Sequence, residues 1–140
     1  SLEKLVLRKK MQNNVVEITL DKPSKEIKFG NSSKISFHSA ETVSKNKENL
    51  ISVDFKKLLF PLKLRNVKNG DYFFPIGMIG KKKVVKFLKD RKINSVDKFN
   101  KLVLVNGDDE IIWVVGMRLD RRFSVSDGSK KIIDIKIDNY

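Results

Sequence analysis

Short runs in which apolar and polar residues alternate fill the first half of the chain, and this period of two is typical of β-strands. Such runs or clusters of strand-forming residues occur at positions 4–8, 15–20, 25–29, 34–38, 50–55 and 60–65. Turn-forming sequences separate several of them, including Asp-Lys-Pro-Ser at 21–24 and Gly-Asn-Ser-Ser at 30–33. We therefore predict short antiparallel strands, with residues 44–49 as a solvated loop.

After Gly80 the pattern changes to the period of an amphipathic helix. The apolar side of this helix would hold Val84, Val85, Phe87 and Leu88. The opposite side would hold a stripe of lysines at i, i+4 and i+7, namely Lys82, Lys86 and Lys89. A second short helix is predicted after Ser95, because a serine side chain there can accept a hydrogen bond from an unpaired backbone N–H.

The last third of the chain predicts a hairpin and a final strand. Apolar residues at 102–105 and 110–116 flank Asn106-Gly107, a pair that tolerates the positive φ of tight hairpin turns. Asp108 and Asp109 are expected to lengthen that loop. Isoleucines between residues 132 and 137 predict the final strand. The whole pattern indicates an α+β fold that is mostly antiparallel, with one or two short helices.

Composition indicates one domain with a polyanionic partner. The chain has 140 residues, of which 40% are hydrophobic, which fits a single globular domain. Its formal net charge is +13, and residues 61–101 alone contain twelve basic and three acidic residues. Such a field attracts polyanions, so nucleic acid or an anionic membrane surface is the expected partner. The binding surface should centre on the middle third.

Several classes of protein are excluded or disfavoured. The sequence has no apolar run long enough to span a bilayer, and binding to a membrane surface would need a basic amphipathic helix lying in the interface. Of the two polyanions, nucleic acid is therefore the expected partner, and no membrane is. It has no cysteine, which removes disulfides and thiolate metal sites and agrees with a reducing cytoplasm. Ser1 stands where an initiator methionine is expected and no signal peptide follows, which indicates a fragment of a longer protein.

Seven cations fall within twelve residues on or beside the predicted amphipathic helix. They are Lys81, Lys82, Lys83, Lys86, Lys89, Arg91 and Lys92. Only Asp90 offers an i,i+4 partner, to Lys86, so most of the set is predicted to be unpaired. A phosphate backbone suits such a surface, because lysine and arginine neutralise it and release condensed counterions. The alternative is a solubilising outer face.

Gly77 and Gly80 precede the lysines and invite two motif interpretations. A P-loop needs four residues between its glycines and a Ser or Thr after the lysine, and neither condition is met. The G-x-x-G loop of a KH module follows a helix, which Pro75 disfavours. Two tight backbone turns remain the favoured interpretation.

Chemically distinctive single residues indicate structure instead of catalysis. His38 is the only histidine, with no metal-ligating partner at suitable spacing and no nucleophile motif for a catalytic triad. Trp113 lies in an apolar run, which favours core packing over base stacking. The aromatic residues at 72–74 could form a stacking platform, but at least one is expected to be buried because strand neighbours point to opposite faces.

The middle of the chain resembles a known family. The matching segments are FPLKLR (60–65), GD (70–71), PIGM (75–78), GKKK (80–83), Phe87, KI (92–93), IWVVGMR (112–118) and DRRF (120–123). Their order and spacing closely resemble the C-terminal domain of bacterial tRNA(Ile)-lysidine synthetase. The resemblance covers residues 53–125, whereas residues 1–52 match only loosely and 126–140 would add a terminal strand to the same single domain, 1–140. Two positions depart from the family pattern, with Lys98 in place of an arginine and Asn94 in place of a proline.

This resemblance implies a β-sandwich or barrel-like fold related to a domain of phenylalanyl-tRNA synthetase. It implies a cytoplasmic parent enzyme, an ATP-dependent carbon–nitrogen ligase using ATP and Mg²⁺, which attaches lysine to the wobble cytidine of isoleucine tRNA. Catalysis would belong to an N-terminal domain whose phosphate loop is absent here, so this chain is expected to bind no cofactor and to be inactive alone. Its role would be to bind the acceptor stem beside its own catalytic domain, and the resemblance also implies a homodimer.

The expected RNA-binding residues are basic and come mostly from the middle third. They are Arg65, Lys81, Lys82, Lys83, Lys86, Lys89, Lys92, Lys98, Arg118 and Arg122. A separate prediction is that Arg65, Asp71, Asp120 and Arg122 include structural ion pairs that frame the turns. Two alternatives stay open: a module that docks onto protein, and a stand-alone RNA-binding protein.

Overall fold

The alternating segments form antiparallel sheets in the computed structural model, which describes residues 15–140. The first sheet has the order β1 (Glu17–Leu20), β5 (Leu62–Asn66), β8 (Leu102–Val105), β9 (Ile111–Val114) and β10 (Arg118–Leu119). The second has the order β2 (Ile27–Phe29), β3 (Ser33–Ala40), β11 (Ile132–Asp138) and β4 (Leu50–Asp54). The predicted strands between residues 15 and 65, the hairpin and the final strand are thus confirmed, whereas the predicted run at 4–8 lies outside the described residues.

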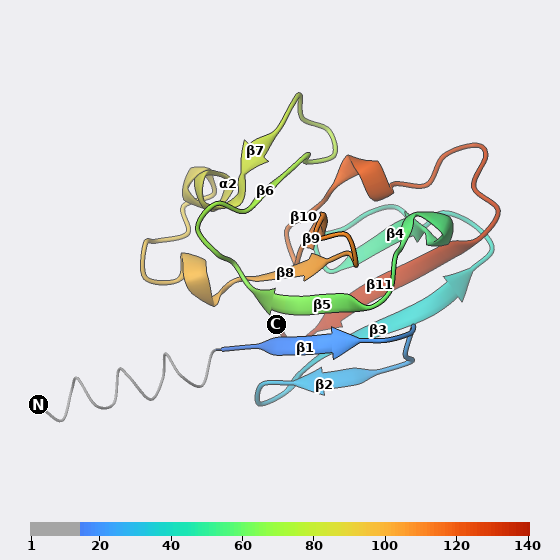
Figure 1. Ribbon diagram of the computed structural model, residues 1–140, viewed down its shortest axis with the longest axis horizontal. Coiled ribbons are helices and arrows are strands. Elements are labelled where there is room, and N and C mark those ends of the chain that lie inside the picture. The colour runs from blue at the N-terminus through green and yellow to red at the C-terminus, as the bar shows by residue number, and fades with distance from the viewer. Residues whose placement is uncertain (1–14) are drawn as a thin grey trace, which may run out of the picture.

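A hairpin and a helix form a third unit, which lies apart from the second sheet at the upper left of Figure 1. Strands β6 (Tyr72–Phe73) and β7 (Lys82–Lys83) pair with each other, and α2 (Val84–Asp90) follows directly. Three 3₁₀ turns complete the described elements: η1 (Phe55–Lys57), η2 (Lys98–Asn100) and η3 (Arg121–Phe123).

The first sheet buries apolar residues on both of its faces. In the β8–β9 hairpin, Leu104 lies opposite Trp113, and both belong to the core shared with the second sheet. Val103 lies opposite Val114, and both belong to a second core beneath α2. Because strand neighbours point to opposite faces, this one hairpin holds the two cores together. Trp113 is fully buried, which confirms its core role.

The second core fixes α2 through its apolar side. Val84, Phe87 and Leu88 are buried there, and Val85 packs at its edge, as the helical period predicts. The fully buried ring of Phe73 in β6 meets Phe87 edge-on at 5.1 Å between ring centroids. That contact also confirms that one of the three adjacent aromatics is buried.

The prediction that Lys82 belongs to the helical stripe is wrong. The helix begins at Val84, and Lys82 instead pairs with Phe73 in the β6–β7 ladder. Its backbone is therefore extended, and it leaves the i, i+4, i+7 pattern. Lys83 is the N-cap residue of α2 and is exposed, so Lys83 and not Lys82 is the exposed lysine at the start of the helix.

Ser95 does not cap the second helix. The second helix is the 3₁₀ turn η2, whose N-cap is Asp97 without a side-chain hydrogen bond. The Oδ1 atom of Asn94 accepts hydrogen bonds from the backbone N–H groups of Val96 and Asp97, at 3.1 and 2.8 Å. The Asn94 side chain therefore accepts hydrogen bonds of the kind that the sequence predicted for Ser95.

Gly77 and Gly80 lie in the loop between β6 and β7 and have φ values of 79° and 76°. The tight-turn interpretation is therefore correct, and no helix precedes the loop. At its tip Ile79 is 97% exposed.

The β8–β9 loop contains a glycine that no other residue can replace easily. The residue of this loop with a positive φ is Asp109, not Asn106 or Gly107. Gly107 is needed for space: its N–H donates to the carbonyl of Leu59 at 2.6 Å, and a Cβ there would lie 2.5 Å from that oxygen.

We expect Gly107→Ala to lower the free energy of unfolding by about 1 to 3 kcal/mol, because the backbone must move away from Leu59 and lose this hydrogen bond. Urea denaturation measures the loss. Gly128→Ala is the control, since an added Cβ meets nothing within 4 Å. Equal midpoints for the two variants would show that the close approach to Leu59 carries no stability.

Candidate nucleic-acid interface

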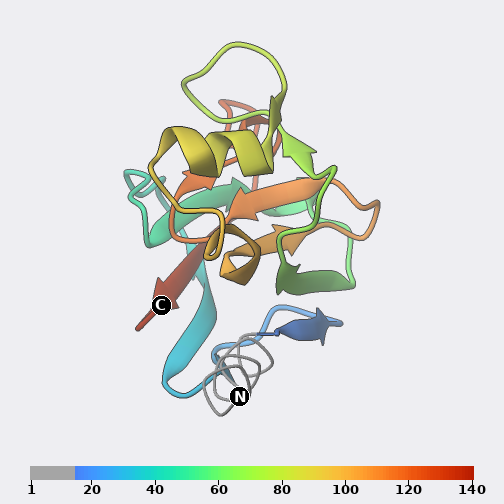
Figure 2. The same ribbon diagram turned by 90° about the vertical axis from the view of Figure 1, so that its left-hand side faces the viewer.

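The cations predicted from the sequence gather on the outward side of α2 and on its flanks. In Figure 2 this helix, drawn in yellow, lies above the orange strands of the first sheet. Its apolar residues pack in the second core with residues of β8 and β9, and Lys86 and Lys89 on its other side are exposed. Six of the seven cations are exposed, whereas Lys82 is half-buried. We call these seven residues the α2 basic surface: Lys81, Lys82, Lys83, Lys86, Lys89, Arg91 and Lys92.

Within residues 15–140, none of these seven cations forms an ion pair within 4 Å. The possible Lys86–Asp90 pair is also not formed. Two of the cations instead lie over aromatic rings: Lys81 lies 4.6 Å from the Tyr72 centroid, and Arg91 lies 4.1 Å from the Phe87 centroid. Such contacts orient a cation without neutralising it. The surface therefore keeps its positive charge.

Lys98 joins the α2 basic surface, although it comes from η2. It is half-buried, and its Nζ lies 5.1 Å from the Phe99 ring centroid. With Lys86 and Lys89 it lines a groove of about 600 Å³ whose floor includes Val85 and Ile93. The structure thus brings Lys86, Lys89 and Lys98 together around one groove, whereas Lys81, Lys82 and Lys83 precede α2 and Arg91 and Lys92 follow it.

Arg65 makes a two-pronged ion pair with Asp71, as predicted. Its Nη1 and Nη2 atoms each donate to a different carboxylate oxygen at 2.9 Å, and both side chains are mostly buried. The backbone carbonyl of Asp71 accepts a hydrogen bond from the N–H of Val84, the first residue of α2, at 2.9 Å. The ion pair therefore fixes where α2 begins, and most of the Arg65 guanidinium is engaged inside the protein.

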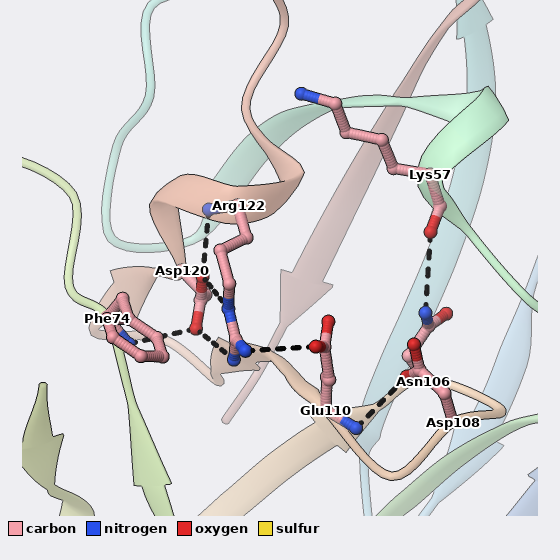
Figure 3. A network of polar contacts seen from close by, with 7 residues as sticks. All are labelled: Lys57, Phe74, Asn106, Asp108, Glu110, Asp120 and Arg122. Atoms are coloured by element: carbon pink, nitrogen blue, oxygen red, sulfur yellow. Dashed lines mark hydrogen bonds and ion pairs between the residues drawn. The ribbon is translucent and has the colours of Figure 1, made fainter.

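Asp120 and Arg122 form the second predicted ion pair (Figure 3). The Asp120 carboxylate is fully buried and accepts from the Arg122 side chain at 2.9 and 3.1 Å. It also accepts from the backbone N–H groups of Phe74 and Arg122, at 2.9 and 2.8 Å. Burial lowers the pKa of Arg122, but Asp120 and Glu110 outweigh this effect, so the net pKa is raised.

The same network continues into the β8–β9 loop. Arg122 also pairs with Glu110 at 3.1 Å, and the N–H of Glu110 donates to Asp108 at 3.1 Å (Figure 3). On the other side of the loop, the Asn106 side chain donates to the carbonyl of Lys57 at 3.3 Å. One set of polar contacts thus links η1, η3, β6 and the hairpin loop. Like Arg65, Arg122 is engaged internally.

Arg118 lies away from the outward side of α2. It is half-buried, and its Nη1 donates to the carbonyl of Ile76 at 3.0 Å. Burial lowers the pKa of its guanidinium, and the nearby charge of Arg91 lowers it further. Two arginines that repel each other therefore stand close together, although they are far apart in the sequence.

Arg121 was not among the predicted site residues. Its Nη1 atom lies within 3.3 Å and 3.4 Å of the carbonyl oxygens of Met78 and Gly80, and it braces the loop that leads into the lysines. The sequence signal was its place in the Asp-Arg-Arg run, but only the fold shows which loop it contacts.

Nothing in the described chain resembles a metal site, since no three acidic or histidine side chains gather there. His38 is exposed. The described part also contains no helix long and apolar enough to cross a membrane.

Comparison with known proteins gives consistent results. A tRNA(Ile)-lysidine synthase from Parabacteroides distasonis is 41% identical over 91 residues, which cover 65% of this chain and 20% of that protein. One from Caldanaerobacter subterraneus subsp. tengcongensis is 29% identical over 143 residues, covering 91% of this chain and 30% of that protein. The chain therefore spans less than a third of the length of these relatives.

Solved structures show the same fold at low sequence identity. The crystal structure of a TilS C-terminal domain matches with a TM-score of 0.73 and 19% identity, covering 87% of this chain and 96% of that one. An N-terminal fragment of the phenylalanyl-tRNA synthetase β-subunit from Pyrococcus horikoshii matches with a TM-score of 0.53 and 15% identity, covering 63% of this chain and 27% of that one. The predicted α+β fold and its relation to the synthetase are thus confirmed.

Residues 62–137, more than half of the chain, match the family described as the TilS substrate C-terminal domain. This match includes α2, the paired Arg65 and Arg122, and the whole β8–β9 hairpin. It confirms the resemblance that the sequence motifs indicated. The chain belongs to the TilS substrate C-terminal domain family.

Proposed function

We propose that this chain is the tRNA-binding domain of a tRNA(Ile)-lysidine synthase and that it binds the acceptor stem through the phosphate backbone. The parent enzyme would use ATP and Mg²⁺ to attach lysine to the wobble cytidine of isoleucine tRNA. Catalysis would belong to its N-terminal domain, and this domain would supply affinity. The supporting comparison is the family membership together with relatives that carry this enzyme name.

The observation that carries the proposal is the unneutralised charge of the α2 basic surface. Lysines without carboxylate partners retain their attraction for phosphate, whereas paired ones have lost much of it. The major groove of an A-form stem is too deep and narrow for side chains to read base edges. Contacts from α2 would therefore recognise the shape and the phosphates of the stem, with little sequence preference.

Most of the predicted RNA-binding residues fall into two groups under this proposal. The exposed lysines of the α2 basic surface, with Lys98, would contact phosphate directly. Arg65 and Arg122 would act mainly by holding the surface in place, because their guanidiniums are engaged by Asp71 and Asp120. A homodimer remains a prediction.

A salt titration tests the proposal. If most of the seven cations each neutralise one phosphate, affinity for an isoleucine tRNA should fall roughly a thousandfold between about 50 and about 200 mM salt. Fluorescence anisotropy with labelled tRNA and the 140-residue chain measures this fall. A double-logarithmic slope near zero would contradict the proposal.

A second candidate function is docking onto a protein, favoured by one observation. Val96 and Phe99 are 63% and 41% exposed beside the groove that Val85 and Ile93 line. Burial of these residues against protein would depend little on salt, since apolar contacts are not screened. The same titration therefore separates the two functions.

A further inference from the structure

A basic cleft lies beside the α2 basic surface. Its volume is about 770 Å³, and it runs between the β3–β4 loop, the end of α2 and the β9–β10 turn. Four cations line it: Lys45, Lys47, Arg91 and Arg118. Glu48 is the one acidic residue among those lining it within the described chain. A cleft with this excess of positive charge is suited to an anion.

The two lysines of the cleft lie in one loop that is anchored to the second sheet. The side chain of Ser44 donates to Asp134 at 2.8 Å, and that of Asn46 accepts from the N–H of Ser52 at 2.9 Å. These anchors fix the loop to the second sheet and leave the intervening Lys45 and the following Lys47 to line the cleft.

The two arginines of the cleft are positioned by other contacts. Arg91 lies over the ring of buried Phe87, at 4.1 Å from its centroid, and Arg118 donates to the carbonyl of Ile76 at 3.0 Å. Neither forms an ion pair within the described residues. Burial lowers the pKa of the Arg118 guanidinium, and the nearby positive charge of Arg91 lowers it further. A bound anion would relieve this repulsion.

The size of the cleft and its place indicate which anion. Its volume of about 770 Å³ falls within the range of small-molecule sites, so it has room for nucleotide-sized groups of one strand. Arg91 directly follows α2 and lines the cleft, so the cleft and the α2 basic surface share this residue. An RNA strand that leaves a stem bound on α2 would meet these four cations next.

We propose that this cleft binds phosphodiester groups of a single-stranded RNA segment adjoining the bound stem. The inference rests on the proposed function, in which the stem is the acceptor stem, whose end is a single-stranded 3′ extension. Two arginine forks can each engage a phosphate through two hydrogen bonds, and the two lysines add charge. The cleft would thereby fix the direction in which the strand leaves the α2 basic surface.

The test compares three labelled RNAs on the 140-residue chain: a blunt-ended hairpin, the same hairpin with a single-stranded 3′ extension, and the extension alone. The extension should raise the affinity of the hairpin about three- to tenfold. Lys45→Gln with Lys47→Gln should remove most of this gain and leave the blunt hairpin unaffected. Both lysines are exposed, so folding should be unchanged. Lys22→Gln with Lys25→Gln, two other exposed lysines, is the control with equal charge and should keep the gain.

Each outcome decides one of the two proposals. If the blunt hairpin binds but the extension adds nothing, or adds as much in the Lys45, Lys47 variant, the cleft proposal is overturned and the proposed function stands. If the blunt hairpin fails to bind, the proposed function is in error. In that case the extension alone still tests the cleft proposal. Lys45→Gln with Lys47→Gln must weaken the binding of the extension, and an unchanged affinity overturns the cleft proposal.

Discussion

Replacing Asp120 by alanine is expected to lower the free energy of unfolding by about 3 to 5 kcal/mol, the range for removing one partner of a buried ion pair. The carboxylate is fully buried and accepts from two backbone N–H groups as well as from the Arg122 side chain. Alanine leaves these donors without an acceptor, and each unsatisfied group costs further stability. Arg122 keeps Glu110 as a partner at 3.1 Å, which limits the loss.

Urea denaturation followed by tryptophan fluorescence measures this effect, since Trp113 lies in the main core. Asp127→Ala is the matched control, because Asp127 is exposed and should change stability by less than about 0.5 kcal/mol. Arg122→Ala should also be strongly destabilising, because it leaves the buried Asp120 carboxylate without its countercharge. An Asp120 variant as stable as the Asp127 variant would rule out a structural role for this network.

Local patterns in the sequence predicted most of the described strands, because burial on one face imposes a period of two. They could not predict pairing: β11 lies between β3 and β4, although nearly a hundred residues separate it from β3. The helix start shows a similar limit. Lys82 fits the helical period, yet its backbone pairs with Phe73 of β6, and this tertiary contact overrides the local preference.

The sequence predicted the candidate site only where its residues are close to one another along the chain. Cations that follow one another along α2 are visible in the sequence, and so was the paired nature of Asp71 and Asp120. The approach of Arg91 to Arg118, and of both to the loop that carries Lys45, depends on how three separate segments fold together. No spacing rule for a single chain encodes that approach.

The two ion pairs explain how a surface made of flexible lysines can be presented in one place. Arg65 holds Asp71, whose carbonyl holds the first residue of α2. Asp120 holds the N–H of Phe74 just after β6, and neighbouring Arg121 contacts the loop before β7. Internal arginines thus fix the elements, whereas solvent-facing lysines remain free to meet phosphate. We therefore expect substitutions in the internal ion pairs to lower stability and substitutions of the solvent-facing lysines to lower the affinity for RNA.

Replacing Lys83, Lys86 and Lys89 together by glutamine should weaken tRNA binding about tenfold to a hundredfold and leave folding almost unchanged. All three side chains are exposed, and glutamine has nearly the helix propensity of lysine. Lys83 makes no side-chain capping hydrogen bond, so its loss does not disturb the start of α2. If each lysine neutralises one phosphate, the slope of log affinity against log salt should flatten by about two to three units.

The matched control replaces Lys22, Lys25 and Lys28, which lie on or before β2, far from α2 in both Figure 1 and Figure 2. It removes the same charge, and the contact of Lys28 with Glu26 at 3.9 Å is exposed and contributes little. Equal weakening by both triple variants would show that net charge alone attracts tRNA. A slope that flattens only in the α2 variant, with unchanged preference among tRNAs, would instead locate the phosphate contacts on α2, because such contacts position a protein without reading sequence.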